Sequence, residues 1–344
     1  MKISKYEKFI PHNIAPYRVK RIGVYNKANG SKVGEFHCQN LKLKRLGKKL
    51  YSFGALSDIH LQYTTAQTDF QKALTYLNDS EDVNFTCICG DLTDNGEDGD
   101  FQTYVEYVNT YSPNTPVYEC AGNHDAYDNM IAFDRLIPYT GHGLYYTFTV
   151  DNDLFIMFGT QWYDTTGQLI SPFSHESLQW LYETLEANRN KRVILFQHYL
   201  RFDGSGKPYP QNPTGKVLEY STEGAVFMSL MEHYKNVVWF HGHSHTKFDC
   251  QEDCSYANYD RMYGCHSVHI PSLAVPRDYV EDAYVSKYAE SEGYVVDVYK
   301  NHIVLRGRDF VKEKFLPIAN YCIDTTIQRI NSNTYVDNTG TINT

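Results

Sequence analysis

Five short groups of acidic, amide and imidazole residues combine residue types that bind metal ions. They are Ser-Asp-Ile-His at 57–60, Gly-Asp-Leu-Thr-Asp at 90–94, Gly-Asn-His-Asp at 122–125, Gln-His at 197–198 and Gly-His-Ser-His at 242–245. Carboxylate, imidazole and amide ligands suit a divalent metal such as Mn, Fe, Zn or Ni better than calcium. The number of candidate ligands indicates two ions. A shared carboxylate can hold two ions ~3.5–4 Å apart, the separation that clamps both oxygens of an in-line phosphoryl displacement.

Each group alone is a weak signal. Asp-x-His usually marks a solvated turn, because aspartate is an ordinary turn residue. A single histidine after an apolar run, such as His198, is more often a surface residue than a ligand. Five such groups in one chain, each directly after an apolar run, argue against coincidence and favour a catalytic metal centre.

The apolar runs before the five groups have the length of buried strands. They span 51–57, 83–89, 116–120, 192–197 and 237–241, and the amphipathic helix patterns between them span 66–78, 99–111, 175–188 and 223–235. Strands that alternate with helices predict a layered α/β fold with βαβ crossovers. Hairpin patterns at 145–160 and 293–309 predict mixed sheets. Ligands bind at the carboxyl edge of such sheets, so we expect the five groups to meet there.

In this order the groups resemble the signature of the calcineurin-like metallophosphoesterases, DxH…GDxxD…GNH[DE]…H…GHxH, over residues 58–245. The resemblance implies a four-layer α/β/β/α sandwich of mixed sheets and a dinuclear metal site. Its implied ligands are Asp58, His60 and His245 for the first metal and Asn123, His198 and His243 for the second, with Asp91 bridging the two.

The same resemblance implies roles for two further residues. His124 would contact the phosphate and act as general acid, and Asp94 would orient its imidazole. Two cations lower the pKa of a bridging water, so the expected mechanism is in-line attack of a metal-bridging hydroxide on phosphorus. A histidine near its ordinary pKa can then protonate the leaving group.

Asp94 also indicates which branch of this family the chain resembles. Purple acid phosphatases carry a tyrosine ligand at this position. Aspartate makes the chain more similar to the bacterial phosphodiesterases, which include the class III cyclic-nucleotide enzymes. Gln197-His198-Tyr199 departs from the His-His-Pro of many such diesterases, which weakens the case for cyclic nucleotides. We therefore expect a metal-dependent phosphoric diester hydrolase.

Alternatives to a free diesterase stay open at this point. One is a phosphomonoesterase of the nucleotidase or protein phosphatase kind. Another is a working enzyme anchored in a larger assembly, such as a phage particle or a cell surface, that acts on a phosphodiester polymer. A binding module without activity ranks lower, since no ligand of the signature is missing and His124 is present.

Three residues near the five groups are candidate substrate contacts. Arg201 follows His198 closely and carries a guanidinium group that matches phosphate geometry. Tyr199 and Trp162 are the other two, at the predicted border of the site. Each has a structural interpretation as well, because Trp162 fits a core position and Arg201 fits a surface charge.

The charge of the chain limits its partners. A net charge of −9 over 344 residues argues against a general nucleic-acid binder, and no apolar run is long enough for a membrane helix. Because no signal peptide is visible, we expect a cytoplasmic protein, with virion or surface association as the alternative. Residues 1–50 carry 13 Lys/Arg but only 2 Asp/Glu. This segment either docks on the acidic remainder or contacts an anionic or assembly partner.

The sequence predicts three parts. Residues 1–50 are predicted to be a basic N-terminal β-hairpin extension, residues 51–310 the catalytic domain, and residues 311–344 a C-terminal extension with a polar tail. Three cysteines, Cys250, Cys254 and Cys265, lie close together in the sequence, so a disulfide or a small zinc site stays open for them.

Overall fold

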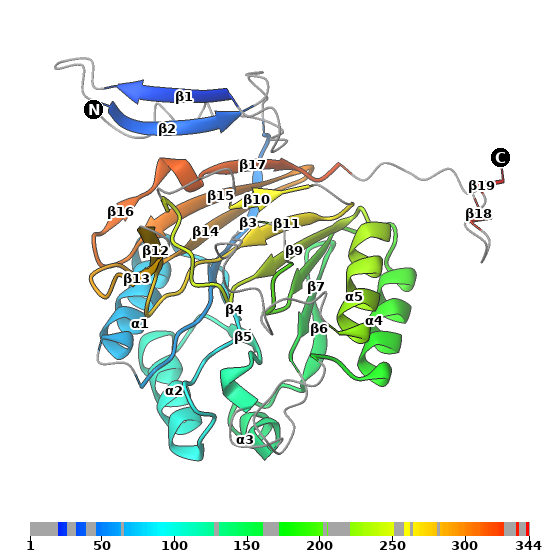
Figure 1. Cartoon of the computed structure of the whole chain (residues 1–344), viewed down its shortest axis with the longest axis horizontal. Coiled ribbons are helices and arrows are strands. Elements are labelled where there is room, and N and C mark those ends of the chain that lie inside the picture. Colours follow the sequence, from blue (N-terminus) through cyan, green and yellow to red (C-terminus); the bar gives the residue numbers. More distant parts are fainter. Residues whose placement is uncertain are drawn as a thin grey trace.

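Two mixed β-sheets packed face to face form the centre of the protein (Figure 1). The computed structural model describes residues 20–25, 32–38, 46–62, 65–126, 131–160, 172–201, 205, 221–250, 258–261, 264–280, 283–326, 335–336 and 342–343. Within these residues the layered α/β fold predicted from the strand and helix patterns is confirmed.

The first sheet has the strand order β16-β15-β14-β3-β4-β5, and β17 also pairs with β15. Its strands are β3 (Lys49–Leu56), β4 (Phe85–Cys89), β5 (Val117–Cys120), β14 (Glu292–Tyr299), β15 (His302–Asp309), β16 (Lys314–Phe315) and β17 (Tyr321–Asp324). β3, β4 and β5 are parallel, whereas β14 is antiparallel to both β3 and β15. The three parallel strands therefore bring their carboxyl ends to one edge.

The second sheet has the strand order β10-β11-β9-β8-β7-β6. Its strands are β6 (Tyr145–Val150), β7 (Asp153–Phe158), β8 (Val193–Phe196), β9 (Val237–His241), β10 (Tyr259–Asp260) and β11 (His266–His269). β7, β8, β9 and β11 are parallel, and the two outer strands are antiparallel to their neighbours. This sheet also contributes parallel carboxyl ends, those of β8 and β9.

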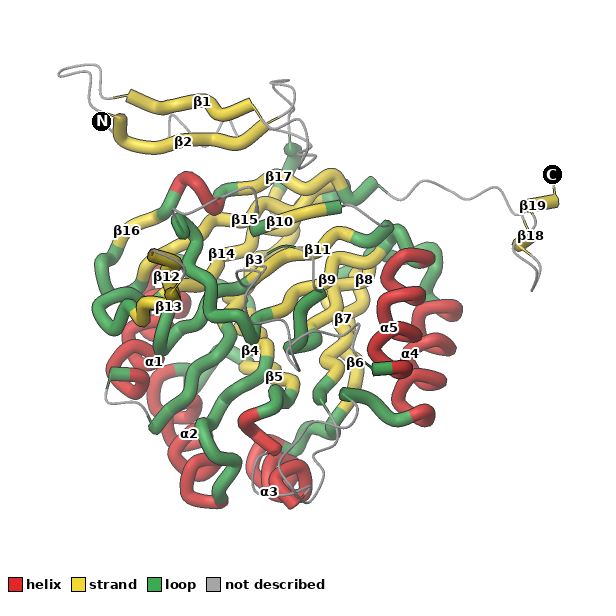
Figure 2. The backbone as a smooth tube through the Cα atoms, viewed as in Figure 1, coloured by secondary structure: helices red, strands yellow, loops and turns green. Residues whose placement is uncertain are grey.

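Helices cover the outer faces of the two sheets, as Figure 2 shows. They are α1 (Ala66–Thr75), α2 (Asp98–Tyr111) and α3 (Ile131–Thr140) on the first sheet, and α4 (His175–Ala187) and α5 (Thr222–His233) on the second. A π-helical turn (Tyr76–Ser80) extends α1, and short 3₁₀ turns occur at His124–Ala126 and Pro317–Ala319. The order helix, sheet, sheet, helix confirms the predicted four layers.

Three apolar cores correspond to the three interfaces between layers. Phe53, Phe155 and Phe240 pack between the two sheets. Phe70 of α1 belongs to the core under the first helical layer, and Leu181 of α4 to the core under the second. Both faces of the central parallel strands are thus buried, which explains why they appear in the sequence as nearly continuous apolar runs.

Among the residues that the structure describes, three two-stranded ribbons lie outside the main sheets. They are β1 (Lys20–Tyr25) with β2 (Lys32–Cys38), β12 (Arg277–Val280) with β13 (Ala283–Ser286), and β18 (Tyr335–Val336) with β19 (Ile342–Asn343). The β1–β2 ribbon is the predicted N-terminal hairpin, and its turn lies outside the described residues. β17 pairs with β15, so the first sheet continues past residue 310. The division of the chain into three domains stays a prediction.

Two further expectations concern a membrane span and the cysteines. In the part of the chain that the structure describes, no helix is both long and apolar enough to cross a membrane. Cys265 is a buried thiol without a disulfide. Cys254 lies outside the described residues, so the structure does not test the predicted cysteine site as a whole.

Candidate metal centre

The five groups of polar residues meet where the carboxyl ends of the two sheets come together. Asp58 and His60 follow β3, Asp91 follows β4, Asn123 and His124 follow β5, His198 follows β8, and His243 and His245 follow β9. All of these residues are buried except His124 and His243, which are partly exposed. The structure thus clusters the side chains of six of the seven predicted metal ligands, which come from both sheets, and the seventh, Asn123, is buried in the loop after β5.

One cluster of metal-binding groups consists of Asp58, His60, Asp91 and His245, whose ligand atoms lie within 4.8 Å of one another. Nε2 of His245 lies 3.0 Å from Oδ1 of Asp58 and 3.2 Å from Nε2 of His60. Nε2 of His60 lies 3.7 Å from Oδ2 of Asp91. These four side chains surround one position that can hold a metal ion.

A second cluster consists of Asp91, His198 and His243. Nε2 of His198 lies 3.1 Å from Oδ2 of Asp91 and 3.2 Å from Nδ1 of His243. Asp91 therefore belongs to both clusters. Asn123 is buried directly before His124, whose backbone N–H donates to Oδ1 of Asp91 at 2.9 Å.

The hydrogen bonds around the histidines show that this donor set fits a metal. Nδ1 of His245 faces the carbonyl oxygen of Val275 and Nδ1 of His198 faces that of Cys89, and a carbonyl can only accept. Nδ1 of His60 faces the Asp94 carboxylate. Each Nδ1 therefore carries the proton, and the three Nε2 atoms turn lone pairs toward one another and toward carboxylates. A cation between these facing acceptors, either a proton or a metal ion, would remove the repulsion between their lone pairs.

The electrostatics of the cluster also favour bound positive charge. Burial lowers the pKa of His198, but the carboxylates of Asp91 and Asp58 outweigh burial and raise this pKa to about 10. Burial raises the pKa of Asp91, but the neighbouring imidazoles of His198 and His124 hold it well below its usual range. Burial lowers the pKa of His245 to about 4 despite Asp58, which keeps this imidazole neutral and able to ligate.

The backbone of the ligand loops is strained. Of the eight non-glycine residues with positive φ in the described part of the chain, five are predicted ligands: Asp58 (52°), His60 (43°), Asp91 (50°), His243 (71°) and His245 (58°). Left-handed backbone costs a residue with a side chain ~1–2 kcal/mol. Such outliers cluster at functional sites, where the surrounding structure enforces them.

Close packing around the ligands also requires glycine. A Cβ atom at Gly242 would overlap Oγ of Ser57 and Oδ2 of Asp58. A Cβ atom at Gly122 would overlap the side chain and the backbone nitrogen of Asp91. The glycines in the motifs therefore allow the backbone to approach the ligand carboxylates closely.

His124 and Asp94 lie beside the first cluster. Nδ1 of His124 lies 2.8 Å from the main-chain oxygen of Asp94 and 3.4 Å from its Oδ1 atom. The Asp94 carboxylate is nearer to His60, with 3.0 Å between Oδ1 and Nδ1. Asp94 thus contacts the imidazole that it was predicted to orient, and it also contacts a predicted metal ligand.

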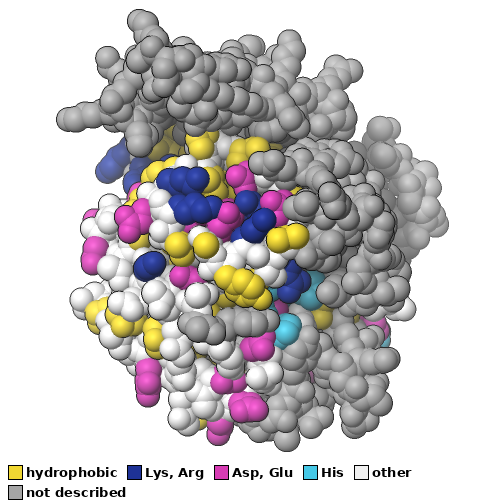
Figure 3. All heavy atoms as spheres, turned by 60° about the vertical axis from the view of Figure 1, so that its left-hand side comes forward, with side chains coloured by type: hydrophobic (Ala, Val, Ile, Leu, Met, Phe, Trp, Pro, Cys, Tyr) yellow, Lys and Arg dark blue, Asp and Glu magenta, His cyan; other side chains and the backbone are white. Residues whose placement is uncertain are grey.

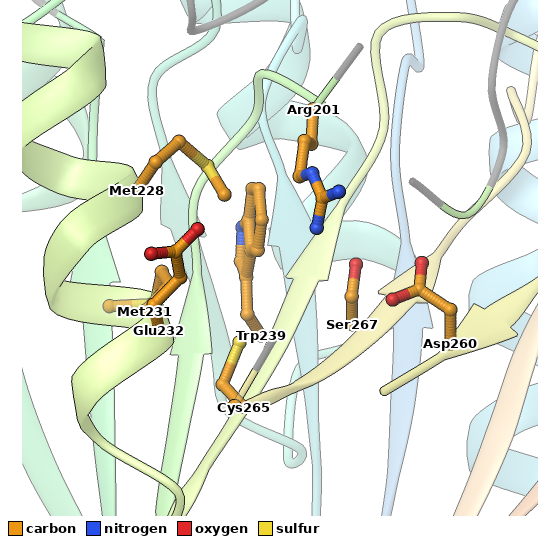
Figure 4. A pocket seen from close by; sticks show the side chains of 9 residues that line it. Arg201, Met228, Met231, Glu232, Trp239, Asp260, Cys265 and Ser267 are labelled. Atoms are coloured by element: carbon orange, nitrogen blue, oxygen red, sulfur yellow. The ribbon is translucent and has the colours of Figure 1, made fainter. Parts of the chain in front are cut away.

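The three predicted substrate contacts have different outcomes. The Tyr199 ring is buried with its centroid 4.5 Å from that of His243, so it packs on a predicted ligand. Arg201 is 8% exposed and lines a small pocket between α5 and the second sheet with Trp239, Asp260 and Cys265 (Figure 4). None of the predicted metal ligands lines this pocket. Trp162 lies outside the described residues.

Sequence reasoning gave no role to several residues that hold the ligands in place. The carboxylate of Asp125 accepts hydrogen bonds from the backbone N–H groups of Thr93 (2.9 Å) and Gly122 (2.8 Å), and so ties two ligand loops together. Oγ of Ser57 donates to Oδ2 of Asp58 at 2.6 Å. Ser57 directly precedes Asp58, and Asp125 lies two positions after Asn123. Their places within the motifs were the signal that could have identified them.

Comparison with known proteins agrees with this geometry. The model of the Metallophos family, described as calcineurin-like phosphoesterase, matches residues 51–247, more than half of the chain. The chain belongs to this family. The match ends just after His245 and contains every predicted metal ligand, so the sequence resemblance is confirmed at the level of the family.

Three solved structures that are similar to this chain have low sequence identity to it. The GAP50 anchor of the inner membrane complex of Plasmodium is 14% identical, with 82% of this chain and 90% of that chain covered at a TM-score of 0.54. The protein TT1561 of Thermus thermophilus is 10% identical, with 70% and 99% covered and a TM-score of 0.42. The NAD nucleotidase of Haemophilus influenzae is 13% identical, with 77% and 53% covered and a TM-score of 0.41.

At 14% identity and a TM-score of 0.54, the similarity to the GAP50 structure shows the fold alone. No curated protein sequence matches the chain significantly.

Proposed function

We propose that this chain is a phosphoric diester hydrolase with a dinuclear metal centre. The observation that supports the proposal is that Asp91 belongs to both clusters of metal-binding side chains. In the proposed site Asp58, His60 and His245 would hold the first ion, and Asn123, His198 and His243 the second, with the Asp91 carboxylate between them. Two bound divalent ions would activate a water molecule and stabilise charge on the phosphoryl oxygens.

The proton donor in this proposal is His124. Its imidazole is about one quarter exposed, so a substrate can reach it from solvent. Because Nδ1 faces the main-chain oxygen of Asp94, the proton that can be transferred lies on Nε2. Asp94 fixes the ring and His124 would protonate the leaving oxygen, a contribution of ~10²–10⁴-fold in rate.

The preference for diesters rests on Asp94, which occupies the position where the purple acid phosphatases carry tyrosine. The alternative is a phosphomonoesterase of the nucleotidase or protein phosphatase kind.

The metal pair is drawn from Mn, Fe, Zn and Ni, which suit carboxylate and imidazole ligands. The cytoplasmic location and the partner of the basic N-terminal segment stay predictions.

The test is a metal-reconstituted assay of the wild-type chain and the Asn123→Ala variant. Bis-nitrophenyl phosphate and nitrophenyl phosphate are compared with Mn²⁺, Ni²⁺, Zn²⁺ and Fe²⁺. The matched control is Gln179→Ala, which removes an exposed amide on α4. We expect faster cleavage of the diester by wild type and the control, and its loss in Asn123→Ala.

The outcomes separate the candidates. Faster cleavage of the monoester would favour the phosphomonoesterase. A protein that binds metal and cleaves neither substrate would indicate a narrow natural substrate and contradict a general diesterase. A protein that binds no metal would contradict the catalytic proposal altogether.

A further inference from the structure

The side chain of Tyr199 lies against the second cluster of metal-binding groups. Its ring centroid is 4.5 Å from that of His243, with the two planes at 51°, and 5.9 Å from that of His198, with the planes at 75°. The His198 and His243 rings are themselves 5.0 Å apart. Three aromatic rings therefore pack against one another, and two of them belong to predicted ligands of the second ion.

Tyr199 is held in place by the apolar core behind it. Its side chain is buried and belongs to the core between the second sheet and the helices α4 and α5. Side chains in such a core are closely packed and keep well-defined positions. The tyrosine ring therefore offers the imidazole of His243 a rigid surface.

His243 is less enclosed by protein than His198. His198 is fully buried, and its Nδ1 atom lies 2.7 Å from the carbonyl oxygen of Cys89. His243 is partly exposed, and imidazole side chains reach the surface on the face shown in Figure 3. Exposed side chains change rotamer within picoseconds to nanoseconds unless contacts restrict them. The contact with the Tyr199 ring provides such a restriction.

Backbone hydrogen bonds hold the loop that carries His243. The N–H of Gly242 donates to the carbonyl of His198 at 3.0 Å, and the N–H of His243 donates to Oδ2 of Asp58 at 3.1 Å. These bonds fix the backbone, whereas the direction of the imidazole depends on contacts of the side chain. That direction keeps Nδ1 of His243 3.2 Å from Nε2 of His198, so that both rings converge on one position.

We propose that Tyr199 is a positioning residue of the second metal site, a role that rests on the proposed function. Its ring holds the His243 imidazole at the angle at which His243 and His198 bind the same ion. The role acts through His243 and requires no contact with the substrate. Loss of a group that orients a metal-binding histidine typically weakens metal affinity by ~10–100-fold.

The test compares Tyr199→Leu, which removes the ring, with Tyr199→Phe, which retains it. The matched control is Phe227→Leu, because Phe227 is a fully buried ring of the same core that packs against Phe158, Phe173 and Trp239, none of which is a predicted ligand. Each metal-free protein is titrated with Mn²⁺ by calorimetry. Visible absorption of the Co²⁺ complexes reports the ligand geometry, and the melting temperature is measured for every variant.

We expect the wild type to bind two ions. Tyr199→Leu should bind one of them with wild-type affinity and the other at least ~10-fold more weakly, with a changed Co²⁺ spectrum. Excess Mn²⁺ should restore part of its hydrolysis of bis-nitrophenyl phosphate. Tyr199→Phe should behave like the wild type. Phe227→Leu should melt at a lower temperature and still bind both ions with wild-type affinity.

Three results would overturn the role of Tyr199. The first is wild-type affinity for both ions in Tyr199→Leu. The second is an equal loss of affinity in Phe227→Leu, which would assign the effect to a weakened core. The third is an equal loss in Tyr199→Phe, which would assign the effect to the hydroxyl group.

The two proposals fail in different ways. If the wild type binds two ions and hydrolyses no phosphoester, the proposed function fails, and the metal titrations still test Tyr199. If the wild type hydrolyses the diester and Tyr199→Leu matches it in metal affinity and rate, only the role of Tyr199 is lost. A wild type that binds a single ion would overturn both proposals.

Discussion

Oδ1 of Asp94 lies 3.0 Å from Nδ1 of His60. Asp94 is not itself a predicted metal ligand, but its carboxylate accepts from Nδ1 of His60 and so keeps the proton of this predicted ligand on Nδ1. Oδ1 of Asp94 also lies 3.4 Å from Nδ1 of His124. One carboxylate thus connects the first metal cluster with the proposed proton donor. Carboxylates that support a metal-binding histidine in this way orient the ring and raise its basicity.

Replacing Asp94 should therefore affect metal binding as well as catalysis. We expect Asp94→Asn to weaken metal affinity by ~10–100-fold, because the amide supports His60 less well than the carboxylate does. Titration of the metal-free protein with Mn²⁺ measures this affinity, and Asp79→Asn, an exposed aspartate, is the control. If Asp94→Asn binds metal with wild-type affinity but hydrolyses the substrate slowly, Asp94 acts only through its contact with His124.

Replacing Gly242 by alanine, which adds one methyl group, should abolish metal binding. A Cβ atom there would overlap Ser57 and Asp58, so Gly242→Ala should displace the loop that carries His243 and His245 and lose metal binding. Gly99→Ala is the matched control, because no atom lies within 4 Å of its Cβ position near the start of α2. That control should be neutral or more stable by up to ~1 kcal/mol. Metal content and thermal unfolding of both variants check these expectations.

A buried ion pair of the second sheet is hydrogen-bonded to the first sheet. Asp153 of β7 accepts hydrogen bonds from Tyr51 of β3 and from Arg192, and Arg192 also donates to the carbonyl of Tyr299 at 2.9 Å. The Asp153 and Arg192 side chains are only 7% and 5% exposed. Asp153→Ala would leave the Arg192 guanidinium buried without its charge partner, so it should lower the free energy of unfolding by ~3–5 kcal/mol.

Urea unfolding of Asp153→Ala measures that cost. Arg189→Ala, which breaks an exposed pair with Glu186, should cost at most ~1 kcal/mol. Equal effects of the two substitutions would show that the buried pair does not hold the sheets together.

Glu292 should make stability depend on pH. Burial, with the charge of Asp249, raises its pKa to about 8, although the N–H of Phe248 donates to Oε2 at 2.7 Å and lowers the pKa. The folded pKa thus lies above the usual value for glutamate, so the native state retains a proton that the unfolded chain releases. The contribution of this group to stability is complete below pH ~4 and falls as the pH rises toward about 8.

The Glu292→Gln variant should remove this dependence, since its side chain does not titrate. Urea unfolding at pH 5, 7 and 9 should show a smaller fall in stability for Glu292→Gln than for wild type. Glu106→Gln, an exposed glutamate on α2, should behave like wild type. Parallel pH profiles for wild type and Glu292→Gln would contradict a raised pKa.

Much of this architecture follows from local patterns in the sequence. The predicted strand that ends at residue 241 is β9, and the predicted helix at 175–188 is α4, which Ser174 caps with its side chain accepting from the N–H of Ser177. These patterns are visible because apolar periodicity and caps depend on neighbouring residues. The bridging role of Asp91 was implied by the family resemblance. Its place beside the other groups was predictable, since the parallel strands end at the same edge.

Other features could not be predicted from the sequence because they depend on distant contacts. α3 was missed, and it contains Pro138, which normally argues against a helix. Arg201 was selected as a phosphate contact because it is close to His198 in the sequence, and sequence distance cannot show that its side chain lines a pocket without any predicted metal ligand. Its role as a phosphate contact stays a prediction.

The division of the ligands between two sheets also constrains the order of folding. The facing nitrogens of His60 and His245 are 185 positions apart in the sequence, so closing this contact requires both sheets to be assembled and packed. Contacts of such high sequence separation form late, because loop-closure entropy opposes them until other contacts are in place. A metal ion would then be captured by an already compact chain and would slow unfolding more than it speeds folding.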